Sequence, residues 1–364
     1  MEVKMTMTMN HLLDTASAVR TGEELNPEKV SAFIRQHLPT LTGEPVIEQF
    51  AGGASNLTYL LRYPERDLIL RRPPFGHRAK SAHDMLREAN IMSALKPVYR
   101  YVPGVIATCS DPTIMDCDFY VMERLHGIIP RQNLPKDLAL SVEDTRRLCL
   151  NVIDKMIELH QIDYQQAGLA SIAKGAGYVA RQVTGWSERY RQAKTEDVGD
   201  FESVMQWLHD KMPTHDLTTC LIHNDFRFDN VVLNPENPTE VIGVLDWEMA
   251  TLGDPLMDLG NTLAYWVQAD DDAVFQSVRR QPTHLPGMLT RQEVITYYGE
   301  KTGYRVDNFD FYAIFGLFRL AVIVQQIYYR YFHGQTTNPA FANFGKLSNY
   351  LEQRCLGLIR TSSL

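Results

Sequence analysis

The stretch LIHNDFRFDNVVLNP, residues 221–235, is apolar at both ends and densely polar in its centre. Its polar side chains include His223, Asn224, Asp225, Arg227, Asp229 and Asn230. Asn and Asp are common turn formers, so a surface hairpin loop between two buried strands is one explanation. A catalytic loop is the other, and the stretch by itself does not decide between them.

A second acidic segment follows after a short hairpin. Residues 241–248 read VIGVLDWE, a strand-like run that ends in Asp246 and Glu248. A hairpin returns the chain toward the strand before it, so the two polar clusters can converge. The pair of clusters therefore favours a site over a plain loop.

Phosphoryl transfer explains why these residue types occur together. One carboxylate must orient the acceptor hydroxyl and take its proton, and we expect Asp225 in that catalytic role. Mg²⁺ takes a few oxygen ligands from a protein and keeps waters and substrate phosphates, which suits Asn230 and Asp246. Arg227 is expected to neutralise charge on the transferred phosphoryl group. Asp258, near the start of a later helix, is expected to hydrogen-bond the loop from behind.

Before residue 126 the chain alternates short strand-like segments with turns that contain Gly or Pro. These segments predict a five-stranded antiparallel sheet with one inserted helix. The expected strands are residues 44–53, 56–64, 66–74, 104–109 and 119–125, and the expected helix is residues 82–95. The turn AGGASNLTY, residues 51–59, can bring backbone N–H groups close to phosphates, although Gly-Gly is also an ordinary hairpin turn.

The predicted helix places one carboxylate, Glu88, on the same stripe as the apolar residues Met85, Met92 and Leu95. A buried Glu is rare unless it is paired. The preceding strand, LILRR, sets Ile69 and Arg71 on one face because side chains alternate along a strand. We therefore expect Arg71 to be the partner of Glu88.

Beyond Gly127 the periodicity becomes mainly helical, which predicts an α+β fold. The expected helices are roughly residues 141–161, 176–193, 198–211, 255–268, 291–302, 308–333 and 339–358. Only residues 220–223, 230–234 and 240–247 interrupt them as strands. The prediction is an extension at 1–43, loose to about residue 25 and then helical from Pro27, a lobe at 44–125, and a helical lobe at 126–364.

Composition and charge argue against several classes of protein. The 364 residues carry a formal charge of −8, which disfavours nonspecific binding to nucleic acid. The five cysteines form no CxxC pair, so reduced thiols in a cytoplasmic protein fit best. The first 20 residues have no continuous apolar core typical of a signal peptide. The run FYAIFGLFRLAVIV, residues 311–324, is too short to span a membrane and contains Arg319, so we expect a buried helix and no membrane partner.

Several motifs occur in an order that resembles a known group. The catalytic stretch has the spacing HxDxxxxN found in protein kinases. The ordered motifs are GGASN at 52–56, LILR at 68–71, Glu88, VMERL at 121–125, HNDFRFDN at 223–230 and LDWE at 245–248. From about residue 44 to 350 the chain resembles the aminoglycoside phosphotransferase and choline kinase superfamily, which has a protein-kinase-like, two-lobed fold. LILRRPPFGH at 68–77 and VLDWEMATLGDPLMDLG at 244–260 are most similar to the kinase domains related to those fused to acyl-CoA dehydrogenases.

The resemblance implies how ATP binds. A glycine-rich loop covers the phosphates, Arg71 takes the place of the phosphate-binding lysine, and Glu88 orients Arg71. Met122 lies behind the adenine, and the backbone of the residues after it supplies the hinge hydrogen bonds. The residues expected to bind ATP are Gly52, Gly53, Ser55, Ile69, Arg71, Glu88, Met122, Glu123 and Leu125.

The resemblance also implies the catalytic set. Asp225 is the base, Asn230 and Asp246 hold Mg²⁺, and Glu248 is a secondary metal ligand. His223 is structural, with its ring bonded to the loop backbone.

Two departures from protein kinases matter, the first for nucleotide affinity and the second for the acceptor. Arginine replaces lysine at position 71, and the two differ in reach and donor geometry. The metal motif reads Asp246, Trp247, Glu248, and no activation loop ending in APE follows. We therefore expect a small-molecule hydroxyl acceptor, and the relatives fused to acyl-CoA dehydrogenases suggest a hydroxy acid or a hydroxyacyl thioester.

Two other functions remain open at this stage. In a metal-dependent phosphoester hydrolase, His223, Asp225 and Asp246 would bind a transition metal directly. In a noncatalytic nucleotide-binding regulator, the fold would persist without turnover, which the arginine at position 71 makes worth testing.

Overall fold

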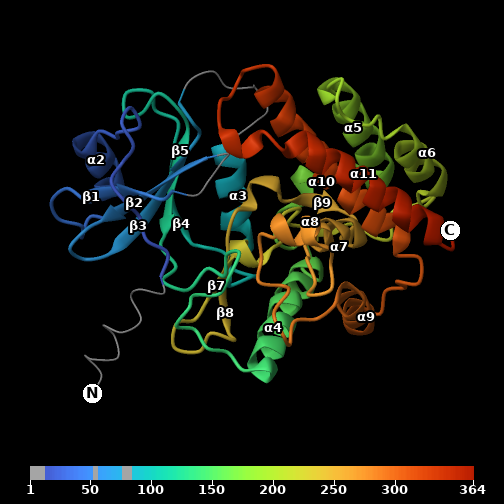
Figure 1. Ribbon diagram of the computed structural model, residues 1–364. Helices are drawn as coiled ribbons and strands as arrows, with labels where there is room; N and C mark the ends of the chain where they lie inside the picture. Colours follow the sequence, from blue (N-terminus) through green and yellow to red (C-terminus); the bar gives the residue numbers. More distant parts are fainter. Residues whose placement is uncertain (1–12, 52–55, 76–83) are drawn as a thin grey trace.

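The computed structural model describes residues 13–51, 56–75 and 84–364, which form a smaller N-terminal lobe and a larger helical lobe (Figure 1). The N-terminal lobe contains an antiparallel sheet in the order β1-β2-β3-β5-β4. Its strands are β1 (Val46–Gln49), β2 (Leu57–Arg62), β3 (Asp67–Arg72), β4 (Val105–Cys109) and β5 (Phe119–Glu123), and α3 (Met85–Leu95) is inserted between β3 and β4. The predicted five-stranded sheet and its inserted helix are confirmed.

The two faces of this sheet enter different cores. Leu60, Ile69 and Met122 join α3 in the core that continues into the helical lobe. On the other face, neighbouring strand residues such as Leu61 and Leu70 pack with α2 (Pro27–His37). The alternation follows from the two-residue period of a strand, which turns successive side chains to opposite faces.

The segment before β1 is part of the N-terminal lobe. Asn26 caps α2 and Pro27 occupies its first turn, as the sequence predicted. Ser17 forms a β-bridge with Gln49, so the expectation of a loose extension is wrong for this residue. Gln49 is the last residue of β1, and its free edge offers backbone groups that a neighbouring segment can pair with.

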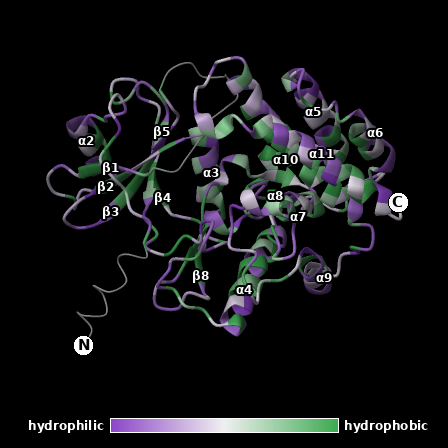
Figure 2. Cartoon of the chain, in the orientation of Figure 1, coloured by the Kyte–Doolittle hydropathy of each residue, from purple (hydrophilic) through white to green (hydrophobic). Residues whose placement is uncertain are grey.

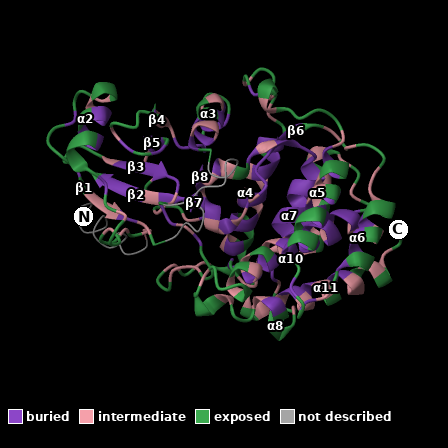
Figure 3. Ribbon diagram, turned by 90° about the horizontal axis from the view of Figure 1, so that it is seen from above, coloured by how far each residue is buried: buried purple, intermediate pink, exposed green. Residues whose placement is uncertain are grey.

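Helices dominate the second lobe, in close agreement with the predicted ranges. They are α4 (Val142–His160), α5 (Tyr178–Ala193), α6 (Glu202–Lys211), α7 (Pro255–Ala264), α8 (Ala273–Ser277), α9 (Arg291–Thr302), α10 (Asp310–Phe332) and α11 (Phe344–Thr361). The main differences are that α8 was not predicted, that α6 begins four residues later and α7 ends four residues earlier than predicted, and that residues 339–341 form a separate 3₁₀ turn before α11. The α4–α11 helices surround a buried centre, shown in purple in Figure 3.

The centre of this lobe is the crossing of α7 and α10. All residues of α7 are buried, and hydrophobic residues gather along both helices (Figure 2). A Cβ atom on Gly260 would lie 2.3 Å from the backbone oxygen of Tyr312, so glycine is what lets the helices approach. By length and composition α10 could cross a membrane, but 67% of its most apolar window is buried in the lobe, as expected of a core helix.

Four short strands frame the quoted stretch. They are β6 (Cys220–Ile222), β7 (Val231–Leu233), β8 (Val241–Val244) and β9 (Thr251–Gly253). The β7–β8 hairpin was expected, whereas the pairing of β6 with β9 was not. A strand of three residues is too short to show an alternating pattern, which is why the sequence did not reveal β9.

Candidate functional site

Asp258 holds the loop between β6 and β7 from behind, as predicted. Its carboxylate accepts the backbone N–H groups of His223 and Asn224, each at 2.8 Å. It also contacts Nε2 of His160 at 3.1 Å. Burial acts to raise the pKa of Asp258, but its bonds to His160 and the loop hold that pKa below the usual value. Asn224 adopts the left-handed backbone conformation, with φ of 64°, at this anchored turn.

His223 is part of the scaffold of the loop. Its Nδ1 accepts the backbone N–H of Asp225 at 3.2 Å, and its Nε2 lies 3.0 Å from the backbone oxygen of Leu245. A neutral imidazole with the proton on Nε2 satisfies both contacts. The buried ring thus ties the catalytic loop to the segment that carries Asp246, and the predicted bonding to the loop backbone is confirmed.

Asp225 is held by two neighbours within the same loop. Asn230 Nδ2 and Arg227 Nη2 donate to Asp225 Oδ2 at 3.0 and 3.1 Å. The side chain of Asp225 keeps 19% of its surface exposed, so the carboxylate remains accessible. Because the amide nitrogen of Asn230 is used here, its oxygen is free to point elsewhere. The close approach of Asp225, Arg227 and Asn230 is confirmed, while their chemical roles stay predictions.

Arg71 joins three segments that are distant in the sequence. Its Nη1 donates to Glu88 Oε1 at 2.7 Å, and its Nη2 donates to Asp246 Oδ1 at 3.1 Å. Glu88 is fully buried on α3, and Asp246 follows β8 with a left-handed φ of 65°. Burial acts against the charge on Arg71, but Glu88 and Asp246 hold its pKa above the usual range. The predicted pairing of Arg71 with Glu88 is confirmed, and the arginine also links the two lobes.

Most of the residues predicted to bind the nucleotide and the metal line an interlobe cleft of about 190 Å³. Those that line it are Ile69, Arg71, Met122, Glu123, Leu125, Asn230 and Asp246. Glu88 supports Arg71 from behind, and Asp225 contacts the cleft through Asn230. Gly52, Gly53 and Ser55 lie outside the described residues.

Two of the predicted site residues use part of their hydrogen-bonding groups in contacts within the protein. The backbone N–H of Glu123 donates to the carbonyl of Gly104 at 2.9 Å, so only the carbonyl of Glu123 can bind a base. Glu248 lies on the 3₁₀ turn Trp247–Met249, where its carboxylate accepts from Asn56 Nδ2 at 2.7 Å. Glu248 is therefore tied to the residue that follows the glycine-rich turn.

The donors in the cleft fit a magnesium ion. Asn230 and Asp246 present oxygen atoms of the kind that Mg²⁺ prefers. Within residues 13–51, 56–75 and 84–364, no group of three or more His, Cys, Asp or Glu side chains is placed to hold a metal. Two protein ligands suit an ion that takes its other ligands from waters and phosphates, and suit a closed transition-metal site less well.

Sequence reasoning missed several residues that line the cleft, among them Asp229, Asp14 and Arg131. Asp229 pairs with Arg227 at 3.3 Å, and its place beside Asn230 could have drawn attention to it. At the mouth of the cleft, Asp14 accepts from Arg131 Nη2 at 2.9 Å. No local pattern could have identified this pair, since the two residues are 117 positions apart.

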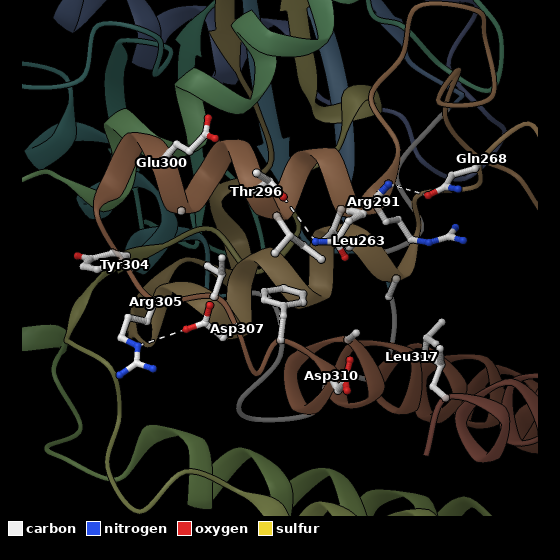
Figure 4. A pocket seen from close by; sticks show the side chains of 18 of the residues that line it. Leu263, Gln268, Arg291, Thr296, Glu300, Tyr304, Arg305, Asp307, Asp310 and Leu317 are labelled. Atoms are coloured by element: carbon white, nitrogen blue, oxygen red, sulfur yellow. Dashed lines mark hydrogen bonds and ion pairs between the residues drawn. The ribbon is translucent and has the colours of Figure 1, made fainter. Parts of the chain in front are cut away.

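A larger hollow, of about 840 Å³, lies in the helical lobe between α9 and α10 (Figure 4). Among the described residues, none of those predicted for catalysis or nucleotide binding lines it. Its arginines are already paired, with Arg291 bound to Asp271 at 2.6 Å, Arg305 bound to Asp307 at 3.3 Å, and Arg354 also bound to Asp271. Most of the predicted nucleotide and metal residues that the structure describes therefore lie at the smaller interlobe cleft.

Comparison with known proteins agrees with this geometry. The model of the phosphotransferase enzyme family (APH) matches residues 46–293. Mouse acyl-CoA dehydrogenase family member 10 is 36% identical over 314 residues, which is 86% of this chain but 29% of the mouse protein. This chain thus spans less than a third of that relative.

Solved structures show the same fold. A protein from Ralstonia eutropha assigned as an aminoglycoside phosphotransferase superposes with a TM-score of 0.80 at 27% identity, covering 94% of this chain and 100% of the other. Choline kinase from Cryptosporidium parvum superposes with a TM-score of 0.64 at 14% identity, covering 92% and 96%. With its kinase-like fold and the family match over most of its length, the chain belongs to the phosphotransferase enzyme family.

Proposed function

We propose that this protein is a small-molecule kinase that transfers the γ-phosphoryl group of ATP to a hydroxyl group, with Mg²⁺ as cofactor. One observation carries the proposal: Arg71, Asn230 and Asp246 line one interlobe cleft, directly beside the accessible carboxylate of Asp225. The family match supports the reaction type.

The reaction needs one proton transfer and one displacement. The acceptor oxygen forms a bond to the γ-phosphorus, the bond from that phosphorus to the bridging oxygen breaks, and ADP leaves. Asp225 orients the acceptor hydroxyl and takes its proton, while Asn230 and Arg227 fix the carboxylate through Oδ2. Arg227 brings positive charge close to the transferred group.

The nucleotide side depends on Arg71 and the hinge. Arg71 is fixed by Glu88 and so presents its charge at a defined place in the cleft. Met122 and Ile69 give the cleft an apolar wall for a base. Asn230 and Asp246 would hold Mg²⁺, which when bound would neutralise charge on the phosphates.

For the acceptor we propose a hydroxy acid or a hydroxyacyl thioester. The support is the match to acyl-CoA dehydrogenase family member 10, a name that suggests acyl chemistry near this domain. The chain covers 29% of that protein, so the acceptor is a proposal for the domain alone. We propose that the protein binds neither nucleic acid nor a membrane and that it is cytoplasmic.

The geometry favours this proposal over a transition-metal hydrolase. Both ring nitrogens of His223 are engaged by the backbone, and the ring is fully buried. A histidine in that state has no free lone pair for a metal.

The test is ATP turnover against a panel of hydroxy acids, hydroxyacyl thioesters, sugars and amino alcohols. We expect Mg·ATP to protect the protein against thermal unfolding and at least one alcohol to be phosphorylated, with the phosphoester detected by mass spectrometry. Protection by Mg·ATP without transfer to any acceptor would favour a nucleotide-binding regulator.

A further inference from the structure

Arg319 on α10 is a nearly buried cation next to the catalytic loop. Only 3% of its surface is exposed. Its Nη2 donates to the backbone oxygen of Asn224 at 3.1 Å, one residue before Asp225. The same nitrogen lies 3.7 Å from Sδ of Met249. Arg319 therefore lies against the loop that presents the proposed base.

The charge on Arg319 lacks a carboxylate partner among the described residues. Arg71 and Arg227 each contact two carboxylates, whereas no Asp or Glu described in the structure lies within 4.0 Å of Arg319. Arginine is rarely this buried without a pair, and burial of an unpaired charge is costly. The ring of Trp186, with its centroid 5.1 Å from the guanidinium carbon, offsets part of that cost.

Tyr265 contacts Arg227 of the catalytic loop, and Met249 contacts Arg319. The guanidinium of Arg227 lies 4.7 Å from the centroid of Tyr265. Burial raises the pKa of Tyr265, while both Arg227 and Arg319 act to lower it, so its hydroxyl is within electrostatic reach of both arginines. Met249 is 38% exposed, which places an open surface beside the Arg319 guanidinium.

A second arginine extends this positive region outward. Arg189 is exposed on α5, and its guanidinium carbon lies 4.7 Å from the centroid of Trp186. Trp186 is thus in contact with two arginines, one exposed and one buried. An approaching anion would meet positive charge first at Arg189 and then at Arg319.

We propose that Arg319 is the residue that selects the acceptor, and that it binds an anionic group of a metabolite whose hydroxyl lies at Asp225. The inference rests on the proposed kinase function. Around Arg319, the contacts with Trp186 and Met249 and with the carbonyl of Asn224, the residue before Asp225, supply an aromatic ring, a thioether and a cation with no carboxylate partner among the described residues. A carboxylate or phosphate satisfies that cation with charge-assisted hydrogen bonds, whereas an amino alcohol meets like charge.

The experiment compares matched acceptors on wild-type protein and Arg319→Gln. The acceptors are isomers of hydroxyhexanoate, the corresponding neutral hydroxyhexanamides, the corresponding aminohexanols and the coenzyme A thioesters of the acids. Glutamine removes the charge but keeps an N–H donor for the carbonyl of Asn224. Arg330→Gln is the matched control, because Arg330 lies exposed on the same helix.

We expect wild type to prefer an anionic acceptor. Arg319→Gln should raise the KM for that acceptor by roughly 10- to 100-fold, the loss typical of one charge-assisted contact, with little change in kcat or in the KM for ATP. Arg319→Lys should recover part of the loss, and Arg330→Gln should match wild type. If the variant affects only the thioester, the anion recognised is a phosphate of the carrier; if it affects the free acid, the anion is the carboxylate.

Two results would overturn the role of Arg319. One is a wild type that uses the amides or aminohexanols as well as the acids; the other is an Arg319→Gln variant that loses activity equally with all acceptors, as expected of a purely structural residue. If wild type phosphorylates no alcohol at all, the kinase proposal fails separately. In that case the anion site is tested by thermal unfolding with hydroxyhexanoate. Protection of wild type but not of Arg319→Gln would support the anion site, and no protection of wild type would reject the anion site.

Discussion

Arg71 and Arg319 are both nearly buried arginines, one on each side of the catalytic loop, and their surroundings differ in one respect. Arg71, on the nucleotide side, contacts Glu88 and Asp246. Arg319, on the acceptor side, contacts a backbone oxygen, a thioether and an aromatic ring. Arg71 thus has two carboxylate partners within the protein, whereas Arg319 has none among the described residues, and we propose that the acceptor supplies that partner.

The largest expected effect concerns Asp225, which lies between these two sides. Asp225→Ala should lower kcat by roughly 10²- to 10⁴-fold, the usual contribution of a general base, and leave the thermal shift caused by Mg·ATP nearly unchanged. Turnover and thermal shift are measured on the same preparations. Asp210→Ala, which removes an exposed carboxylate on α6, is the control. Wild-type turnover by Asp225→Ala would remove this residue from the mechanism.

Glu88→Gln would remove the nearer of the two carboxylates that contact Arg71, at 2.7 Å, while it keeps the side-chain shape and leaves Asp246 as the other partner. We expect the KM for ATP to rise by about tenfold or more, and the free energy of unfolding to fall by about 3–5 kcal/mol, since one partner of a buried pair is lost. ATP titrations and urea unfolding measure the two effects. Glu48→Gln breaks a more exposed ion pair with Arg62 and should change neither measurably. An unaltered KM for ATP in Glu88→Gln would mean that Arg71 does not position the nucleotide.

Asp258 supports the catalytic loop between β6 and β7. Its lowered pKa predicts that the free energy of unfolding depends on pH. Its pKa is lowered in the folded protein, so its contribution is complete above the unfolded value of about 3.9 and is lost as the pH falls through the folded value. Asp258→Asn should lose about 2–3 kcal/mol at neutral pH, the cost of a mismatched buried hydrogen-bond partner.

Urea unfolding between about pH 5 and pH 3 measures this contribution, because that interval spans the unfolded pKa. The curve of stability against pH should be flatter for Asp258→Asn than for wild type. Asp270→Asn, at an exposed position, serves as the control and should keep the wild-type slope. Parallel curves for wild type and Asp258→Asn would show that another carboxylate controls acid unfolding.

The smallest effect is expected for an arginine that is exposed and already paired. The side chain of Arg305, at the hollow between α9 and α10, is 90% exposed and pairs with Asp307 (Figure 4). Arg305→Ala should leave kcat, both KM values and the melting temperature within experimental error, because exposed ion pairs contribute little. A loss of turnover in Arg305→Ala would show that the large hollow takes part in catalysis.

Much of the nucleotide side was predictable because its signals are local. Glu88 stood on an apolar stripe of one helix, and Arg71 lay on the preceding strand, 17 positions earlier. Periodicity reports which faces of an element are buried, and a buried charge calls for a partner nearby. Asp225, Asn230 and Asp246 belong to two polar clusters joined by a hairpin, so their approach also followed from local structure.

The contacts of Arg319, on the proposed acceptor side, were hidden from sequence reasoning. Arg319 appeared only as a charge that interrupts an apolar helix, and nothing in the run of residues pointed to the carbonyl of Asn224, 95 positions earlier. The link of Asn56 to Glu248 spans 192 positions, and it leaves Glu248 bound to the N-terminal lobe. Such contacts depend on how whole elements pack, which no short pattern records.

The sequence by itself determined every strand except β9, most helices and the polar loop between β6 and β7, because hydrophobic periodicity and turn chemistry act over a few residues. Only the tertiary structure decided which cations are paired. The crossing of α7 and α10 at Gly260 brings Arg319 against the loop, and the meeting of the two lobes brings Arg71 to Asp246. The energy of a charge depends on burial and on neighbours in space, and both are set only when the distant segments pack together.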